Sequence, residues 1–219
     1  MHLTLTDHLT CPRCGPSAGL ILFMESQEDR RVVEGALGCP LCRTQYRISG
    51  RVADLRVPGE AGAGPGARED DGSNALNSDL ALRLAALSEV GDARGFLMVD
   101  GPMALGVADA LASHLPEVEP VVAIASGQAA AARSAGVSAL LESGTLPVAD
   151  RTMRASAWVG GVPEAARLRE LVRVTRPTGR VVIQTAGGSG SLETAASTLG
   201  ELGAEVRARD ATGLVAVVF

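Results

Sequence analysis

The chain of 219 residues contains no lysine, so all 20 of its basic side chains are arginine, and only 2% of its residues are aromatic. Hydrophobic residues nevertheless make up 46% of the sequence. Because aromatic residues are scarce, we expect a core built from alanine, valine and leucine. We interpret the missing lysine, together with the abundance of alanine and glycine, as a bias of genome composition and not as a functional signal.

Two further absences limit the function. The formal net charge is −5, which argues against a dominant role in nucleic-acid binding, since contacts with phosphates require a basic face. No apolar run approaches the roughly 20 residues that a membrane-spanning helix needs. The first residues, Met1 to Thr4, do not resemble a secretory signal. We therefore expect a soluble, cytoplasmic protein without a membrane span.

Cysteine is also scarce, but its arrangement is informative. The four cysteines form two Cys-Pro-x-Cys pairs, Cys11 with Cys14 and Cys39 with Cys42. A gap of two residues lets both thiolates of a tight turn reach one metal ion, and two such turns complete a zinc tetrahedron. Two disulfides would need an oxidising compartment, and a redox pair would not occur twice. The pattern predicts a structural zinc site, with His8 exposed beside it and not a ligand.

The sequence divides into three parts. Residues 1–57 hold both cysteine pairs and are too few to bury a stable core alone, so we expect zinc to stabilise this ribbon. Residues 58–77 are rich in glycine and predict a flexible linker. Residues 78–219 alternate between helical and strand patterns, which is typical of a doubly wound, Rossmann-like α/β sheet. Its last two predicted strands form an antiparallel pair.

The apolar patterns also place the individual elements. In the ribbon we expect strands at residues 3–9, 19–24 and 31–37. In the second part we expect strands at 96–100, 120–125, 138–141, 155–159, 180–184, 205–209 and 214–219. The expected helices are 79–90, capped by Ser78, then 104–115, one that ends at 135, 163–174 and 191–202.

The segment after the second cysteine pair reads Tyr-Arg-Ile-Ser-Gly-Arg-Val at residues 46–52. Together with the cysteine pairs, it resembles the Trm112 family of zinc-ribbon proteins, which bind and activate methyltransferases. That family has a proline where this chain has Arg47. The resemblance implies a protein partner, to which residues 46–52 would offer an exposed strand edge. The alternative is that the ribbon docks on the second part of its own chain.

Two segments of the second part resemble class I S-adenosylmethionine-dependent methyltransferases. Residues 146–150, Leu-Pro-Val-Ala-Asp, are similar to that family's Leu-Pro-Phe-x-Asp loop. Residues 170–180 are similar to its Glu-x-x-Arg-Val-Leu-Arg-Pro-Gly-Gly segment. The resemblance implies the methyltransferase fold with its reversed last strand over residues 78–219. A zinc ribbon in front of such a domain is also similar to the layout of ribosomal RNA guanine methyltransferases.

Under this resemblance, the cofactor loop is residues 100–106, Asp-Gly-Pro-Met-Ala-Leu-Gly. The family's loop reads Asp/Glu-x-Gly-x-Gly-x-Gly, so Asp100 and Gly106 fit its pattern, and Gly101 stands at its first variable position. Two other glycines of the pattern, which let the backbone approach the cofactor closely, are replaced by Pro102 and Ala104.

The ribose acceptor is missing as well. The family places an acidic residue after the second strand, where this chain has Ala125. Losing a hydrogen bond to a charged acceptor costs about 1.5–3 kcal/mol. The family often has an acidic residue near the adenine after the third strand, and the resemblance gives this place to Glu142. Before the fourth strand, where the family often has Phe-Asp, this chain has Met153 and Arg154. Together these departures argue against productive binding of S-adenosylmethionine.

The remaining candidate features have simpler interpretations. The pairs Arg167/Arg169 and Arg173/Arg176 predict a solvated helix face, with a partner surface as the alternative. Trp158 predicts a core residue, with a plug of the cofactor cleft as the alternative. The glycine-rich residues 187–190 predict a strand-to-helix loop, with an anion site at the helix N-terminus as the alternative.

Two functions follow. The first is a non-catalytic, methyltransferase-like zinc-ribbon protein that serves as a platform for protein assembly, with no catalytic residue. The second is an active S-adenosylmethionine-dependent methyltransferase acting on RNA or protein. Only the second would use Asp100, Gly101, Gly106 and Glu142 for the cofactor. In both, Cys11, Cys14, Cys39 and Cys42 bind structural zinc.

Overall fold

A computed structural model describes residues 1–57, 74–90, 95–115, 117–124, 128–129, 132, 136–142, 144–185 and 192–219. Most of the predicted linker, Ala125 and the predicted loop at 187–190 lie outside the described residues. So does much of the predicted helix ending at 135.

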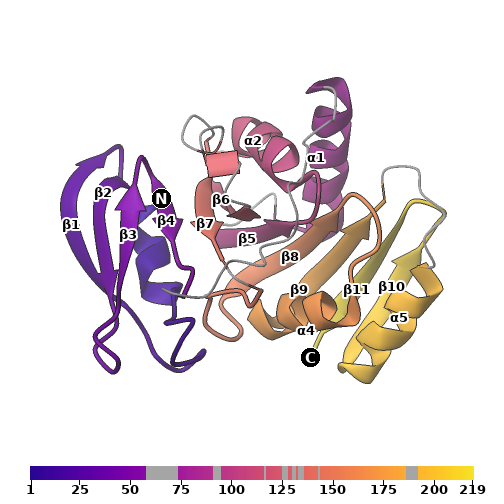
Figure 1. The fold of residues 1–219 in the computed structure, drawn as a ribbon. Coiled ribbons are helices and arrows are strands. Elements are labelled where there is room, and N and C mark those ends of the chain that lie inside the picture. Colours follow the sequence, from indigo (N-terminus) through magenta and orange to yellow (C-terminus); the bar gives the residue numbers. More distant parts are fainter. Residues whose placement is uncertain are drawn as a thin grey trace.

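Eleven strands within the described ranges form one mixed sheet, in the order β1-β2-β3-β4-β7-β6-β5-β8-β9-β11-β10 (Figure 1). The first four come from the ribbon and the other seven from the second part. The strands are β1 (Ile21–Glu28), β2 (Arg31–Gly38), β3 (Gln45–Ser49), β4 (Val52–Asp54), β5 (Gly95–Asp100), β6 (Val118–Ile124), β7 (Ser138–Leu141), β8 (Met153–Val159), β9 (Thr175–Gln184), β10 (Ala204–Arg209) and β11 (Gly213–Val218).

The predicted first strand is instead a 3-10 helix, Leu3–His8. The Leu5 amide donates to the His2 carbonyl over 3.1 Å, and the Thr6 hydroxyl donates to the Leu3 carbonyl over 2.8 Å. These local hydrogen bonds replace the ladder that a strand would need. Leu5 and Thr6 are buried, so this turn also closes the core of the ribbon.

The segment 46–52, predicted to offer a strand edge, is paired on both sides. Tyr46 lies opposite Leu37 of β2, and Ile48 lies opposite Ala53 of β4. β4 in turn pairs with β7. The prediction of an exposed edge in this segment is therefore wrong. The outer strand of the ribbon is β1.

The ribbon continues the sheet of the second part through β4 and β7, which run parallel. Val52 lies opposite Ala139 and Asp54 opposite Leu141. The Leu55 amide extends the ladder by donating to the Leu141 carbonyl over 2.8 Å. The ribbon thus docks on its own chain, one of the two arrangements that the sequence leaves open.

An ion pair also joins the two parts. Arg31 of β2 donates to the two carboxylate oxygens of Glu119 on β6, over 2.7 and 2.8 Å. The Ser138 hydroxyl donates to Glu119 over 2.6 Å and accepts from the His2 amide over 2.8 Å. Both charged side chains are mostly buried. Planar, two-point pairing of this kind fixes orientation as well as distance.

The second part confirms the predicted fold class. β7, β6, β5, β8 and β9 run parallel, while β11 is antiparallel to both of its neighbours, β9 and β10. This is a doubly wound α/β sheet with a reversed last strand. The chain order reverses between β5 and β8, and open α/β sheets bind ligands at the carboxyl ends of the strands around such a point.

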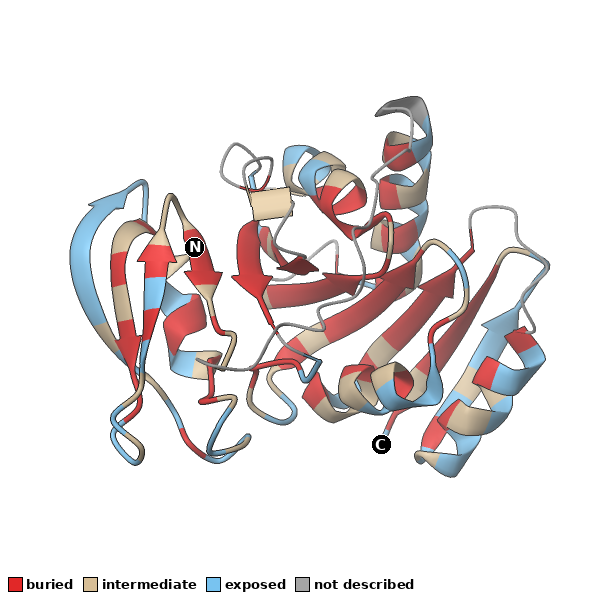
Figure 2. Ribbon diagram, in the orientation of Figure 1, coloured by how far each residue is buried: buried red, intermediate tan, exposed pale blue. Residues whose placement is uncertain are grey.

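Helices cover both faces of this sheet (Figure 1). α1 (Asn74–Ser88) packs on α2 (Ala104–His114), and α4 (Ala165–Val174) packs on α5 (Leu192–Glu201) on the opposite face. The strands β5, β6, β7, β8 and β11 are almost wholly buried, whereas β10 at the edge of the sheet is mostly exposed (Figure 2). α1 begins inside the predicted linker, so Ser78 lies within the helix and does not cap it. The division of the chain at residues 57 and 78 stays a prediction.

None of the helices in the described ranges has the length and hydrophobicity that crossing a bilayer requires.

Candidate metal centre and candidate cofactor cleft

Two matching turns hold the four cysteines. The Gly15 amide donates to the Cys11 carbonyl over 2.9 Å, and the Arg43 amide donates to the Cys39 carbonyl over 2.9 Å. Both closing residues are left-handed, with φ of 94° at Gly15 and 60° at Arg43. The repeated sequence pattern therefore folds into a repeated turn.

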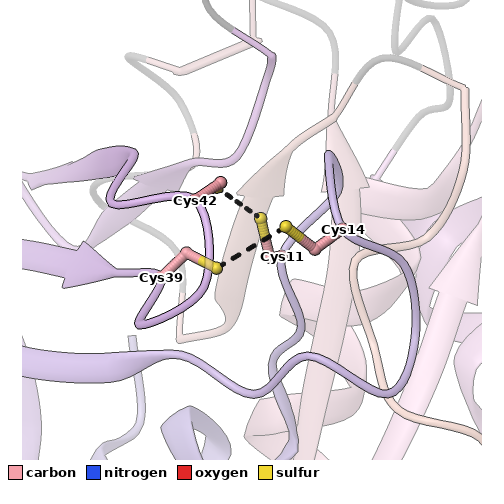
Figure 3. Close-up of side chains that lie close together, drawn as sticks. All are labelled: Cys11, Cys14, Cys39 and Cys42. Atoms are coloured by element: carbon pink, nitrogen blue, oxygen red, sulfur yellow. Dashed lines mark hydrogen bonds between the residues drawn. The ribbon is translucent and has the colours of Figure 1, made fainter.

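The sulfur geometry fits zinc. All four sulfur atoms lie within 4.8 Å of one another (Figure 3). Cys11 Sγ is 3.7 Å from Cys42 Sγ, and Cys14 Sγ is 3.8 Å from Cys39 Sγ. A tetrahedron with zinc–sulfur bonds of about 2.3 Å separates its sulfurs by about 3.8 Å, whereas a disulfide holds them at about 2.0 Å. The cluster therefore suits one Zn²⁺ ion and not two disulfides.

Hydrogen bonds hold two of the sulfur atoms. The Thr44 hydroxyl lies 3.2 Å from Cys42 Sγ, and its hydrogen bond lowers the pKa of Cys42 to about 6. This favours the thiolate, which is the form that binds metal. The Tyr46 hydroxyl lies 3.3 Å from Cys11 Sγ. Burial, and then this hydrogen bond, raise the pKa of Tyr46, so the phenol remains a donor to the sulfur.

His8 is half-buried and not exposed as predicted. Its ring packs edge-on against Phe96 of β5, with the ring centroids 5.4 Å apart. The histidine therefore belongs to the contact between the ribbon and the second part.

Asp100 and Gly101, both predicted for the cofactor, lie at the carboxyl end of β5. Asp100 is fully buried, and its Oδ1 accepts a hydrogen bond from the Gly101 amide over 2.7 Å. Gly101 has φ of 113°, and a side chain there would collide with the backbone of Val159 on β8. Glycine is required at this position because the loop packs directly on β8.

The rest of the predicted cofactor loop turns at once into α2. The Ala104 amide donates to the Gly101 carbonyl over 3.1 Å, and Ala104 is buried as the first residue of the helix. Gly106 lies in the first turn of α2. Of the residues predicted for the cofactor, the structure links Asp100 with Glu142.

The link between Asp100 and Glu142 is Arg167 of α4. Its Nε donates to Oδ2 of Asp100, and its Nη2 donates to Oε1 of Glu142 over 3.0 Å. Its Nη1 donates to the Gly144 carbonyl over 3.0 Å. The exposed fractions of the side chains are 0% for Asp100, 1% for Glu142 and 11% for Arg167. Burial lowers the pKa of Arg167, but the two carboxylates outweigh it and raise the pKa.

The predicted solvated face of α4 is therefore wrong for Arg167, and it is also wrong for Arg173. Arg173 donates to the carbonyls of Leu146 and Val148 over 2.8 and 2.7 Å, and it pairs with Glu170 over 2.7 Å. The Leu146 amide donates to Glu170 over 2.9 Å. The two segments that resemble methyltransferases thus bind each other, while Arg169 and Arg176 are exposed.

The loop held by Arg173 also touches the metal module. The Thr10 amide, next to the first cysteine pair, donates to the Pro147 carbonyl over 3.0 Å. The Ala149 amide donates to the His8 carbonyl over 2.8 Å. One short loop therefore connects the first cysteine turn to the helix that carries Arg167.

Trp158 confirms the prediction of a core residue. It lies on β8 opposite Asp100 and Ile183 of the neighbouring strands, and 8% of it is exposed. It belongs to the hydrophobic cluster on the α4 side of the sheet.

Comparisons with known proteins show the fold. No family model matches the sequence, and no curated protein matches it. Among solved structures, the [4+2]-cyclase SpnF is 19% identical, with a TM-score of 0.52 over 63% of this chain and 60% of the cyclase. A geranyl diphosphate methyltransferase, solved with GPP and sinefungin, is 15% identical with a TM-score of 0.51, over 66% of this chain and 80% of its own. A putative S-adenosyl-L-methionine-dependent methyltransferase from Methanococcus maripaludis is 14% identical with a TM-score of 0.50, over 65% and 84%.

These neighbours share the class I methyltransferase fold. At such identities the likeness concerns fold alone, and a cyclase among the neighbours illustrates that one fold carries several activities. The four-cysteine cluster is compatible with a zinc ribbon. None of the comparisons identifies residues 1–57 as a Trm112-family ribbon.

The two acidic side chains predicted for the cofactor already have partners within the chain. Asp100 Oδ1 and Oδ2 accept from the Gly101 amide and from Arg167. Glu142 Oε1 and Oε2 accept from Arg167 and from the Gly144 amide. All four carboxylate oxygens are therefore engaged within the chain. Sequence reasoning missed Arg167, although its spacing of four and seven residues from Leu171 and Val174 places it beside the buried stripe of α4.

Proposed function

We propose that this protein is a methyltransferase-like, non-catalytic platform for protein assembly that does not use S-adenosylmethionine. The observation that supports it best is Arg167, which engages Asp100 and Glu142 at the point where this fold binds its cofactor. Four cysteines then hold one structural zinc ion, whose full coordination shell leaves no site for catalysis.

The partner surface that we propose is the outer strand β1 with the second cysteine turn. Ile21, Phe23 and Met24 of β1 are 52%, 53% and 47% exposed, and Leu41 between the second cysteines is 71% exposed. The outer edge of β1 lies at the end of the sheet, where backbone groups are open to another strand. This surface replaces residues 46–52 in the proposal.

An active methyltransferase on RNA or protein remains a second candidate. It is favoured by the methyltransferase structures among the neighbours and by the presence of Asp100, Gly101, Gly106 and Glu142. Under this candidate, Arg167 would have to leave the carboxylates before the cofactor binds.

Calorimetric titration of the zinc-loaded protein with S-adenosylmethionine and with S-adenosylhomocysteine separates the two functions. The proposed platform shows no heat of binding with either compound. A dissociation constant in the low micromolar range would overturn the platform and favour the enzyme.

The partner surface has its own test, with capture of proteins from an extract of the native host. Phe23→Glu should lose the captured partner, because a charge replaces an apolar contact. Leu82→Glu is the matched control, since Leu82 is also 53% exposed but lies on α1. Equal capture by both variants would contradict the assignment to β1.

A further inference from the structure

We infer that Arg167 is the residue that excludes S-adenosylmethionine, by acting as a built-in cation for a carboxylate pair that would otherwise bind a cationic small molecule. This inference rests on the proposed function and deepens it, because it names the residue responsible. It differs from the sequence argument, which attributes the loss to Pro102, Ala104 and Ala125.

The guanidinium of Arg167 lies at the end of the sheet where this type of fold binds ligands. Asp100 ends β5 and Glu142 follows β7, so the two carboxylates flank the carboxyl end of β6. Arg167 reaches both of them from the first turn of α4, the helix that follows β8. Its guanidinium therefore lies over the carboxyl ends of the strands at the switch point, where an open α/β sheet binds its ligand.

The guanidinium of Arg167 is fully hydrogen-bonded to its acceptors. Each of the three guanidinium nitrogens donates to a different acceptor, namely Asp100, Glu142 and the Gly144 carbonyl. The other oxygen of each carboxylate accepts a hydrogen bond from a backbone amide, that of Gly101 or Gly144. A ligand with amino or hydroxyl donors would have to displace Arg167 to reach either carboxylate. Lysine could not replace this fork, because its ammonium is a single point charge.

The charge balance gives the ligand class. One guanidinium faces two buried carboxylates, so removal of Arg167 takes one positive charge away from two negative ones. Burial of unpaired charge is unfavourable, so the emptied site should favour a cation. A free guanidinium ion restores the lost shape and charge. The sulfonium and amino group of S-adenosylmethionine supply positive charge in a larger molecule.

The experiment compares zinc-loaded wild type with Arg167→Ala and with the control Arg169→Ala, whose side chain is exposed on the same helix. Thermal unfolding is measured with millimolar guanidinium chloride against equal sodium chloride, and S-adenosylmethionine binding is measured by calorimetry. Guanidinium should raise the melting temperature of Arg167→Ala only. The same variant should gain affinity for S-adenosylmethionine at least about tenfold, which corresponds to about 1.4 kcal/mol.

Each other outcome overturns the inference. If Arg167→Ala is not stabilised by guanidinium, the carboxylates are not a cation site. If it is stabilised but does not gain S-adenosylmethionine binding, Pro102 and Ala104 are the obstacle, and the proposed function survives. If wild type binds as tightly as the variant, Arg167 excludes nothing and the proposed function fails as well. Should Arg167→Ala not fold, the double variant Arg167→Ala with Glu142→Gln, which leaves one carboxylate, replaces it under the same criteria.

Discussion

The cysteine cluster and the Arg167 cluster each gather side chains that attract a cation, but the cation has a different source in each. At the first, four sulfurs gather from two turns at the spacing that suits an external cation. At the second, two carboxylates gather from two strands, and a cation from the chain itself lies between them. A cluster of acidic or thiol groups therefore indicates that a cation is bound there, and that cation can be a metal ion or a side chain of the same chain.

The largest effect should follow from removing the external cation. We expect Cys39→Ser, or a chelator, to remove on the order of 10 kcal/mol of metal-binding free energy. A flexible linker would predict that residues 78–219 are spared. The pairing of β4 with β7 predicts instead that this part also loses stability.

Metal analysis and thermal unfolding check this expectation, with Leu41→Ser in the same turn as the control. One zinc per chain should be found in the wild type and in the control. A metal-free chain with an unchanged melting temperature would contradict the assignment of a stabilising zinc ion to the four cysteines.

Removing the internal cation should have the next largest effect. Arg167→Ala removes the arginine that pairs with two buried carboxylates, and loss of one partner of a buried ion pair typically costs about 3–5 kcal/mol. Arg169→Ala should change stability by less than about 0.5 kcal/mol, because its side chain is exposed. Urea unfolding of both variants measures the difference. Equal stability of the two would mean that Arg167 is not paired in solution.

A smaller effect tests how firmly the ribbon is held on the second part of the chain. Arg31→Ala breaks the two-point pair with Glu119 and should cost about 1.5–3 kcal/mol. Arg30→Ala is the control, since Arg30 is exposed. Hydrogen exchange should become faster in β4 and β7 for the first variant only. Unchanged exchange there would indicate that the ribbon is held by the ladder alone.

The smallest effect concerns the turn around the metal. Arg43 is left-handed, which costs a non-glycine residue about 1–2 kcal/mol, so Arg43→Gly should stabilise the ribbon by up to about 1 kcal/mol. Arg47→Gly, in the exposed face of β3, should destabilise it by about 0.5–1 kcal/mol. Chelator titration followed by thermal unfolding would detect the opposite signs of the two stability changes. The same sign for both variants would show that the left-handed conformation of Arg43 does not affect the stability of the ribbon.

Sequence reasoning succeeded where the pattern is local. The Cys-Pro-x-Cys spacing predicted the sulfur cluster. Short apolar runs predicted the seven strands that the structure describes in the second part, and their alternation with helical segments predicted the fold class. It failed where local and non-local forces compete. Leu3–His8 has strand-like residues, yet local hydrogen bonds make it a 3-10 helix.

The junction and the cleft depend on contacts between distant residues. β4 and β7 are about 85 residues apart in sequence, and nothing in either segment identifies the other. Arg167 lies more than 60 residues from Asp100. The composition of α4 suggests a charged surface helix. The spacing of Arg167 from Leu171 and Val174 places it beside the buried stripe, but only the fold shows that it meets two carboxylates there.

The decisive experiment is a crystal structure of the zinc-loaded protein grown with excess S-adenosylmethionine. We expect one zinc ion among the four cysteines, and the guanidinium of Arg167 between Asp100 and Glu142 with no adenosyl group beside it. An adenosyl group bound at these carboxylates, with Arg167 turned away from them, would contradict this expectation.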